Sequence, residues 1–380
     1  MPFLKDIFKF LSFDGPVHWE MARQLAVMGA TGGESENNPD PLQRIRFEEL
    51  VRVAELRVAD ATGLETSVTG GLLTVRPVTR SEWALRGLDD WRDLLEGLAV
   101  SLGQTGQDQP DDERHDSADP ATGFLGDLTA VMGPMLMSVQ IGGTAGHLAQ
   151  RALGQYDPPL PRPLRDELLV VPVSIDTFAE EWSLPIDDVR LWVLLHEITW
   201  HAVLGRPHVR ARLNELLHEY VTGFRPNPLA LEDRLGDIDP MHPESLQDAL
   251  GDPEALLGAV QTDEQRAVLA RIDALLTPIA GYVDHVLDTV GRQLIGSYGA
   301  LHEALRRRQL AEDDATRFLG RLLGVELGQR QYERGAAFVN GVLERAGGDG
   351  LARLWSEDRN LPTPAEIDAP GLWLARIDLP

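Results

Sequence analysis

The stretch of sequence that decides the fold is Leu191-Trp-Val-Leu-Leu-His196-Glu197-Ile-Thr-Trp200-His201. Before it, Pro185 with two aspartates is a helix start signal, and after it Gly205 with Pro207 is a stop signal. Between these signals, apolar positions recur at helical spacing and form one stripe. The stripe consists of Val189, Trp192, Val193, His196, Trp200 and Val203. We therefore predict a buried helix over residues 185–205, with His196 inside its hydrophobic face.

Within this helix, the segment from His196 to His201 differs by one residue from the zinc-binding motif H-E-x-x-H. In that motif two histidines one helical turn apart hold Zn²⁺, and the glutamate acts on the metal-bound water. Here the histidines lie about 140° apart around a regular helix. Trp200 stands at the ligand position, and an indole has no lone pair for a metal. A π-bulge would bring His201 round; otherwise His196 is a core histidine with one hydrogen bond.

Composition narrows the class of protein. The chain has 380 residues, of which 43% are hydrophobic, and this is enough for a large globular core. Because there is no cysteine, any metal site must use His, Asp or Glu, and we expect a cytoplasmic location. The formal charge is −25. Polyanions would be repelled, so we expect no nucleic-acid partner.

Most of the remaining chain has helical periodicity, and only two segments, Leu73-Thr-Val-Arg76 and Glu167–Val173, resemble strands. Further helices are expected over residues 41–62, 80–102, 128–149, 253–276, 282–306 and 311–345. We predict a mainly α protein, a many-helix single unit with a small β-sheet over residues 1–380. Its N-terminal helical part would be residues 1–104, and residues 121–380 would form the core that carries the motif helix.

Four other segments affect the prediction. Residues 104–120 and 225–252 are polar and rich in proline or glycine, which is typical of a surface loop and an irregular connection. Residues 1–11 are amphipathic, do not resemble a signal peptide, and are expected to pack on their own domain. Residues 128–149 are the most apolar, but Gln140 and His147 interrupt them, so we expect a central helix and no membrane span. The glycines in this run would let a neighbour approach closely.

Several segments, taken in their order along the chain, resemble one known family. They are His18-Trp19-Glu20, Ala152 through Asp157, Asp188 through Thr199, Gly281 through Asp288, Leu323 through Phe338 (which includes Glu326, Arg330 and Tyr332), Trp355 and Leu361 through Ile367. In this order the chain is similar to the zincin-like zinc metallopeptidases of Actinobacteria and Chloroflexi, a family sometimes labelled as associated with coenzyme F420 biosynthesis. The resemblance covers most of the chain. It implies a zincin-like fold, zinc as the cofactor, and a peptide or protein as substrate or partner.

The chain departs from this family at the presumed metal ligands. The resemblance implies an intact H-E-x-x-H and a later Glu-Gly-His-like segment that supplies the third ligand. Only His196 and Glu197 match; Trp200 replaces the second histidine, and Ala280 and Tyr282 stand where the later glutamate and histidine are expected. A catalytic zinc needs three protein ligands and an open position. Two of the three implied ligands are therefore missing.

Two interpretations follow. In the first, the protein is a zincin-like hydrolase relative with a degenerate metal site, noncatalytic or atypically metallated, that works by binding or scaffolding. In the second, it is an active metal-dependent peptidase in which Glu197 is the general base and the ligands have moved. The relocated ligands would be His196 together with two of His201, His208, Asp284 and His285. The sequence leaves enzymatic activity and oligomeric state open.

Overall fold

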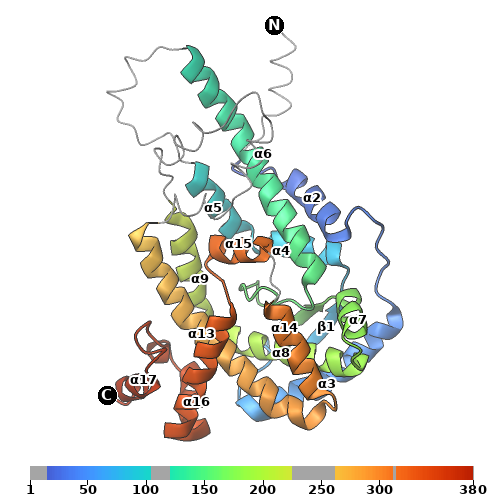
Figure 1. Ribbon diagram of the computed structural model, residues 1–380, viewed down its shortest axis with the longest axis vertical. Helices are drawn as coiled ribbons and strands as arrows, with labels where there is room; N and C mark the ends of the chain where they lie inside the picture. Colours follow the sequence, from blue (N-terminus) through green and yellow to red (C-terminus); the bar gives the residue numbers. More distant parts are fainter. Residues whose placement is uncertain (1–14, 104–119, 225–261, 311–313, 380) are drawn as a thin grey trace.

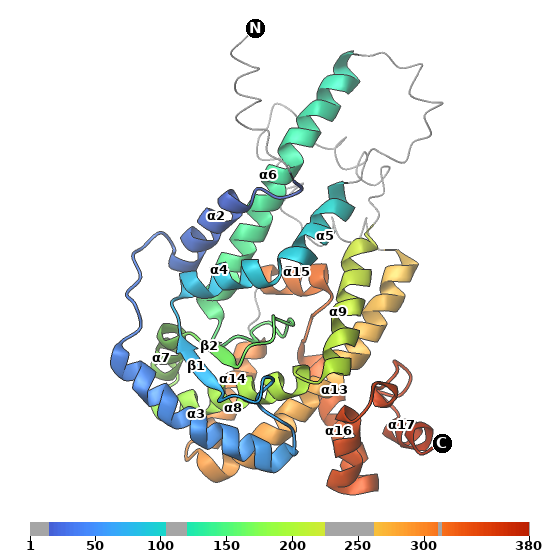
Figure 2. The same ribbon diagram turned by 180° about the vertical axis from the view of Figure 1, so that it is seen from behind.

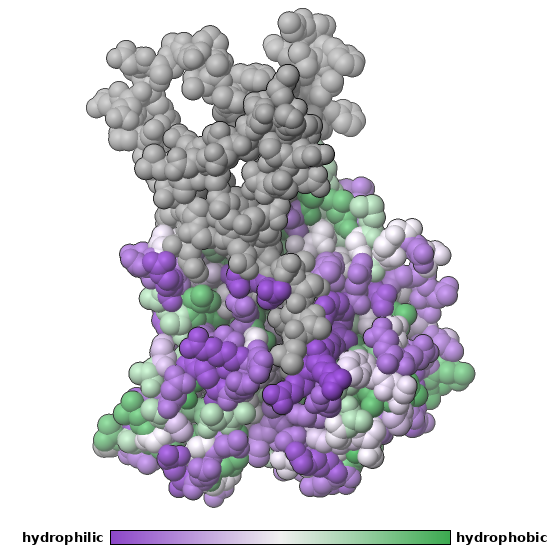
Figure 3. Space-filling view, viewed as in Figure 1, coloured by the Kyte–Doolittle hydropathy of each residue, from purple (hydrophilic) through white to green (hydrophobic). Residues whose placement is uncertain are grey.

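The computed structural model describes residues 15–103, 120–224, 262–310 and 314–379. This part of the chain is mainly α-helical with one small sheet, as predicted (Figure 1). The expectations for residues 1–11 and 225–252, and that for the loop 104–120 apart from its last residue, lie outside the described residues. Hydrophilic residues predominate on the face shown in Figure 3, and hydrophobic residues are scattered over it.

Helices and two short strands make up the regular structure of the first half. They are α2 (Trp19–Thr31), α3 (Pro41–Thr62), β1 (Thr74–Pro77), α4 (Arg80–Asp90), α5 (Arg92–Gly103), α6 (Pro120–Arg151), β2 (Glu167–Val170), α7 (Pro172–Glu181), α8 (Ile186–Leu204) and α9 (Pro207–Thr222). The later elements are all helices. They are α13 (Asp263–Leu294), α14 (Tyr298–Leu310), α15 (Asp314–Leu323), α16 (Gln329–Ala352), the 3₁₀ turns η1 (Arg353–Trp355) and η2 (Asp358–Asn360), and α17 (Pro370–Ile377).

Local sequence signals account for several of these boundaries. Asp40 caps the N-terminus of α3 in a capping box with Gln43, and Gly63 ends the helix in the left-handed conformation, with φ of 66°. The predicted helix over residues 41–62 is therefore confirmed. Thr262 and Gln265 form the same kind of capping box at the start of α13.

Five predicted boundaries were wrong. The helix expected over residues 282–306 is interrupted, because α13 ends at Leu294 and α14 begins at Tyr298. The break expected between residues 276 and 282 is absent, because α13 runs through Pro278 and is closely packed there against α16. The helix expected over residues 80–102 is divided at Trp91, and that over 311–345 is divided near Gly324, whose φ is 72°. The second strand ends at Val170 rather than at residue 173. Pro172 cannot donate in a strand ladder, but it suits the first turn of α7.

Glycines let helices approach closely at two crossings. A Cβ added to Gly142 of α6 would lie 2.4 Å from the carbonyl oxygen of Ala22 in α2. A Cβ on Gly281 of α13 would lie 2.2 Å from the carbonyl carbon of Gly335 in α16. The close approach predicted for the apolar run 128–149 is thus confirmed. Among the described residues, no helix is long and apolar enough to cross a membrane.

The sheet is a parallel pair, β1 and β2, in which Val75 is opposite Leu168 (Figure 2). Gly154, in the segment between α6 and β2, makes an isolated antiparallel bridge to Val170. This bridge holds the segment 152–162 at the end of β2. Because α8 contacts β2 as well as α3, α7, α9 and α13, the motif helix lies in the middle of the packed elements.

Candidate functional site

The motif helix α8 is α-helical throughout Ile186–Leu204 and contains no π-helical turn. His196 and Trp200 are four residues apart and share one face of this regular helix, while Glu197 and His201 share the next face. The bulge that would bring His201 to the side of His196 is therefore absent. The two faces have different neighbours.

Both ring nitrogens of His196 are hydrogen-bonded within α8. The Trp200 indole donates from Nε1 to His196 Nε2 over 3.1 Å, and His196 Nδ1 lies 3.0 Å from Glu197 Oε1. An indole N–H can only donate, so Nε2 must carry the lone pair. The neutral ring therefore holds its proton on Nδ1 and donates it to Glu197. Trp192 stacks on the same imidazole, with ring centroids 5.1 Å apart.

Glu197 is buried, with 1% of its surface exposed, and both of its carboxylate oxygens accept hydrogen bonds. Oε1 accepts from His196, and Oε2 accepts from the backbone N–H of Tyr156 over 2.9 Å. Burial raises the pKa of Glu197 above its usual range, and the hydrogen bonds from His196 and Tyr156 oppose this effect. The carboxylate is thus held in one position by two donors.

His201 faces the segment 152–162 rather than His196. Its Nδ1 lies 2.9 Å from the hydroxyl of Tyr156, and its Nε2 is buried without a hydrogen-bond partner in the described part of the chain. Burial lowers the pKa of His201 to about 4, so the ring is neutral at pH 7. Tyr156 therefore contacts both polar groups on this face of α8, through its backbone and through its side chain.

The segment 152–162 is fixed tightly over Glu197. A Cβ on Gly154 would lie 2.3 Å from Glu197 Cδ, so only glycine allows this approach. Trp83 donates from Nε1 to the Gly154 carbonyl over 2.8 Å, and Arg162 donates from Nε to the Gln155 carbonyl over 3.1 Å. The first bond joins the segment to α4, and the second is internal to the segment and fixes its shape.

Beside these groups lies a cavity of about 160 Å³, which we name the motif cavity. Its walls come from α6, the segment 152–162, α8, α14 and the region 317–332. The lining includes Trp192, His196, Glu197, Trp200, Leu305 and Tyr332. Typical ligand pockets measure about 300–1,000 Å³. The motif cavity has room for one side chain of a ligand.

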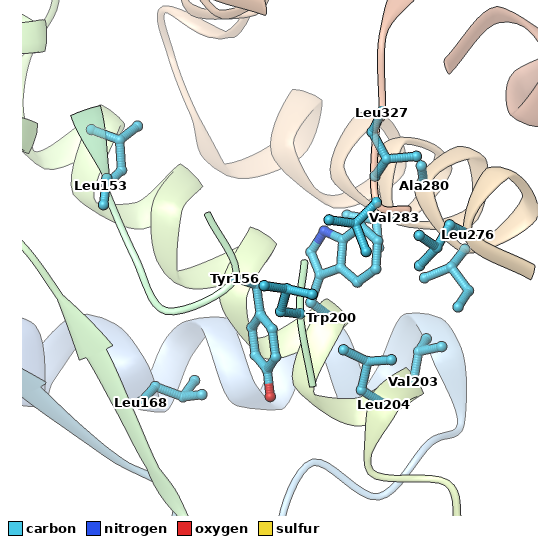
Figure 4. Close-up of a cluster of buried hydrophobic side chains, with 14 of the residues drawn as sticks. Leu153, Tyr156, Leu168, Trp200, Val203, Leu204, Leu276, Ala280, Val283 and Leu327 are labelled. Atoms are coloured by element: carbon cyan, nitrogen blue, oxygen red, sulfur yellow. The ribbon is translucent and has the colours of Figure 1, made fainter. Parts of the chain in front are cut away.

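Trp200 and Ala280, the residues at two of the implied ligand positions, belong to one hydrophobic cluster. Figure 4 shows the Trp200 indole directed toward α13, where Ala280 and Val283 lie. Trp200 is 2% exposed and Ala280 is fully buried. The side chains at these positions therefore pack against apolar neighbours, and neither offers a lone pair to a metal.

The remaining candidate ligands lie in other places. His208 is at the start of α9, and the acids that influence it, Asp358 and Glu357, are near η2. Asp284 and His285 line a second cavity beside α13, although Asp284 is near enough to His196 to interact with its charge. Within the described ranges, no three His, Asp or Glu side chains are grouped closely enough to hold a metal ion.

Sequence reasoning did not assign a role to three residues of this site. Gly154 and Tyr156 hold Glu197, and Trp192 stacks on His196. The segment Ala152–Asp157 contributed to the family resemblance, so a signal was present. Its role could not be read from the sequence, because nothing local indicates that this segment crosses α8.

Comparison with known proteins gives two similarities. The model of a zincin-like metallopeptidase family matches residues 17–374. A crystal structure from Chloroflexus aurantiacus, described as that of a candidate hydrolase with a novel fold, is 28% identical in sequence with a TM-score of 0.64. That similarity covers 96% of this chain and 99% of the other. No curated protein matches the chain.

Proposed function

The chain belongs to the zincin-like metallopeptidase family, and we propose that it is a member without catalytic zinc, which binds a peptide or protein and does not hydrolyse it. The observation that carries this proposal is the hydrogen bond from Trp200 Nε1 to His196 Nε2. It occupies the lone pair that a metal would need, and the donor itself cannot be a ligand.

The donor set near His196 does not fit a catalytic zinc site. Such a site takes three protein ligands and leaves one position open. Ala280 offers no donor atom, and His201 lies on the other face of α8, where it meets Tyr156. Any zinc at His196 would first have to displace Trp200 from its packed position.

The state of Glu197 also supports a binding role. A general base must reach the proton that it removes, directly or through one water. Both oxygens of Glu197 already accept hydrogen bonds, and Gly154 lies against the carboxylate. Glu197 thus joins α8 to the segment 152–162 through the hydrogen bond from Tyr156.

Metal content tests the proposal. The protein is dialysed against micromolar zinc and then against buffer, beside His196→Ala, and metal is measured by mass spectrometry. We expect no retained zinc in either protein and no peptide hydrolysis. One zinc per chain that His196→Ala loses, together with hydrolysis that Glu197→Gln abolishes, would overturn the proposal.

A gain-of-ligand variant sharpens the same test. Trp200→His combined with Ala280→Glu frees His196 Nε2 and restores the two donors that the family resemblance implies. We expect this variant to retain zinc and to unfold at a higher temperature when zinc is present. Trp200→Phe with Ala280→Glu is the matched control, because it frees the same nitrogen without adding the second imidazole.

The second candidate function is an active hydrolase with relocated ligands, and one observation favours it. The Asp284 carboxyl, on α13, is near enough to His196 of α8 to interact with its charge. In this candidate, His196 and Asp284 are two of the metal ligands, and one of His201, His208 and His285 is the third. Glu197 is the general base. This candidate requires that zinc retained by the native protein be lost in Asp284→Asn as well as in His196→Ala.

A further inference from the structure

A second and larger cavity, of about 350 Å³, adjoins the motif cavity. We name it the Asp284 cavity. Trp192, Leu305 and Tyr332 line both cavities and form the partition between them. Its volume falls within the range of small-molecule sites, roughly 300–1,000 Å³. A ligand here would lie next to the imidazole of His196, since Trp192 stacks on that ring.

Most acidic groups of the Asp284 cavity already have partners. Asp288 accepts from the hydroxyl of Tyr298 over 2.7 Å and pairs with Arg292 at 3.2 Å. Glu333 accepts from the side-chain amide of Gln329 over 2.6 Å. These carboxylates are satisfied within the fold.

Asp284 is different. It lies on α13 and lines the cavity, yet it makes no hydrogen bond or ion pair with any residue that the structure describes. Burial raises its pKa from 3.8 to about 7. The Asp284 carboxyl is half-buried, so it has lost part of its hydration without gaining a partner among the described residues. Such a group is expected where a ligand supplies the missing charge.

The walls of the cavity fit an organic cation. Three aromatic rings line it, those of Trp192, Tyr298 and Tyr332. Aromatic faces attract ammonium and guanidinium groups, by about 0.5–2 kcal/mol per contact. Two basic side chains of the lining, His302 and Arg306, are exposed, and burial lowers the pKa of the third, His285, so that this ring is neutral at pH 7. The protein's net charge of −25 would also attract cations.

We infer that the Asp284 cavity binds the alkylammonium or guanidinium group of a Lys or Arg side chain in a peptide ligand. The carboxylate of Asp284 forms the ion pair, and the aromatic rings surround the cation. A divalent metal fits less well, because the described residues group no three suitable ligands together. The inference rests on the proposed function in one respect, namely that a peptide supplies the cation.

Binding of small model compounds tests this inference without any need for catalysis. Nα-acetyl-lysine amide and Nα-acetyl-norleucine amide are titrated into the full chain in the presence of EDTA and followed by calorimetry. The two compounds have nearly the same length, but only the lysine derivative carries a charge. We expect the lysine compound to bind at least about tenfold more tightly, as is usual when a buried charge gains its partner. Equal affinities would overturn the inference.

A matched pair of variants locates the site. Asp284→Asn should weaken lysine-amide binding by about tenfold or more. Asp263→Asn changes a carboxyl on the same helix that is 89% exposed, and it should leave the affinity unchanged. Unchanged affinity in Asp284→Asn would contradict the assignment. Should that variant fail to fold, the comparison of lysine with norleucine on the native protein still decides.

A third arm identifies the source of the cation. n-Pentylamine presents one ammonium group on a chain of the same length without a peptide unit, and it should bind more weakly than the lysine amide. n-Pentylamine of equal or greater affinity would overturn the peptide source. Because EDTA is present, these outcomes do not depend on zinc. Retained zinc with hydrolysis would refute the proposed function alone, whereas failure of the lysine amide to bind would refute this inference alone.

Discussion

The motif cavity and the Asp284 cavity are separated by Trp192, Leu305 and Tyr332, which line both of them. The two cavities differ in whether their polar groups have hydrogen-bond partners. In the motif cavity, His196 and Glu197 satisfy each other and are completed by Trp200 and Tyr156. In the Asp284 cavity, one half-buried carboxyl has no partner among the described residues. Under the proposed function, the residues that look catalytic in the sequence have structural roles.

Under the proposed function, the motif persists while its chemistry changes. Trp200 stands at an implied ligand position, and its indole donates to the Nε2 atom of His196 that a metal would otherwise bind. Once both ring nitrogens are bonded, the pair with Glu197 stabilises the fold like any buried polar network. In the neighbouring cavity, by contrast, Asp284 has no partner among the described residues. Four variants test this contrast.

The largest effect is expected from Gly154→Ala, which disturbs the packing of the segment 152–162 against Glu197 beside the motif cavity. The new Cβ would meet Glu197 Cδ at 2.3 Å, and the carboxylate cannot move without losing both hydrogen bonds. We expect the free energy of unfolding to fall by about 3 kcal/mol, measured by urea denaturation. Gly143→Ala is the control, because nothing lies within 4 Å of its added Cβ and its stability should rise slightly. Equal stabilities of the two variants would show that the segment 152–162 is not closely packed against Glu197.

Asp284→Asn tests the state of the carboxyl in the Asp284 cavity through the pH dependence of the free energy of unfolding. Because the folded pKa is raised to about 7, the native protein keeps the benefit of a protonated Asp284 below about pH 4 and loses it as the pH rises toward 7. Asparagine is always neutral, so the variant should gain about 2 kcal/mol relative to the native protein between pH 4.5 and 8. His201 loses stability on acidification in both proteins, since its pKa is lowered to about 4. Subtracting the two denaturation curves therefore isolates Asp284, and parallel curves would contradict its burial without a partner.

Glu197→Gln separates a structural carboxylate from a catalytic one. The amide can accept from Tyr156 N or from His196 Nδ1, but its NH₂ then faces the other donor, and a shift of the His196 proton to Nε2 would oppose Trp200. One donor is left unsatisfied in every arrangement, which lowers stability by about 1.5 kcal/mol. Glu215→Gln, 63% exposed on α9, should change it by less than about 0.5 kcal/mol. If both variants are as stable as the native protein, Glu197 does not stabilise the fold by joining α8 to the segment 152–162.

Tyr156→Phe gives the smallest expected effect. It removes the hydroxyl that bonds His201 Nδ1 and leaves the backbone bond to Glu197 in place. Loss of one buried hydrogen bond should lower the free energy of unfolding by about 1 kcal/mol, measured by thermal and urea denaturation. Lysine-amide binding should not change, since Tyr156 does not line the Asp284 cavity. A change in that affinity would mean that the two cavities are coupled across Trp192.

Long periodic helices were the part of the fold most open to prediction. The helix from Pro41 to Thr62 and the motif helix were predicted to within one residue of their ends, because caps and stop signals are local. The continuity of α13 through Pro278 was missed. A proline inside a long buried helix is tolerated when packing on both sides holds the helix together, and that packing comes from α16, far along the chain.

The candidate site was predictable in part. The sequence alone located His196 and Glu197, and helical geometry alone separated His201 from His196, since a turn of about 100° per residue requires no tertiary information. Whether His208, Asp284 and His285 could converge on His196 was not predictable, because they belong to α9 and α13, whose packing against α8 is a tertiary property.

The sequence by itself thus determined a mainly α chain, the identity of the motif helix, and the absence of a metal donor at Trp200 and Ala280, because periodicity and side-chain chemistry are local properties. Only the tertiary structure decided that Trp200 bonds Nε2 of His196 and that Gly154 and Tyr156 close over Glu197. It also decided that Asp284 lies beside aromatic rings with no partner in the described part of the chain. These contacts join residues from separate elements. Their energies depend on burial and distance, and neither quantity exists before the chain has folded.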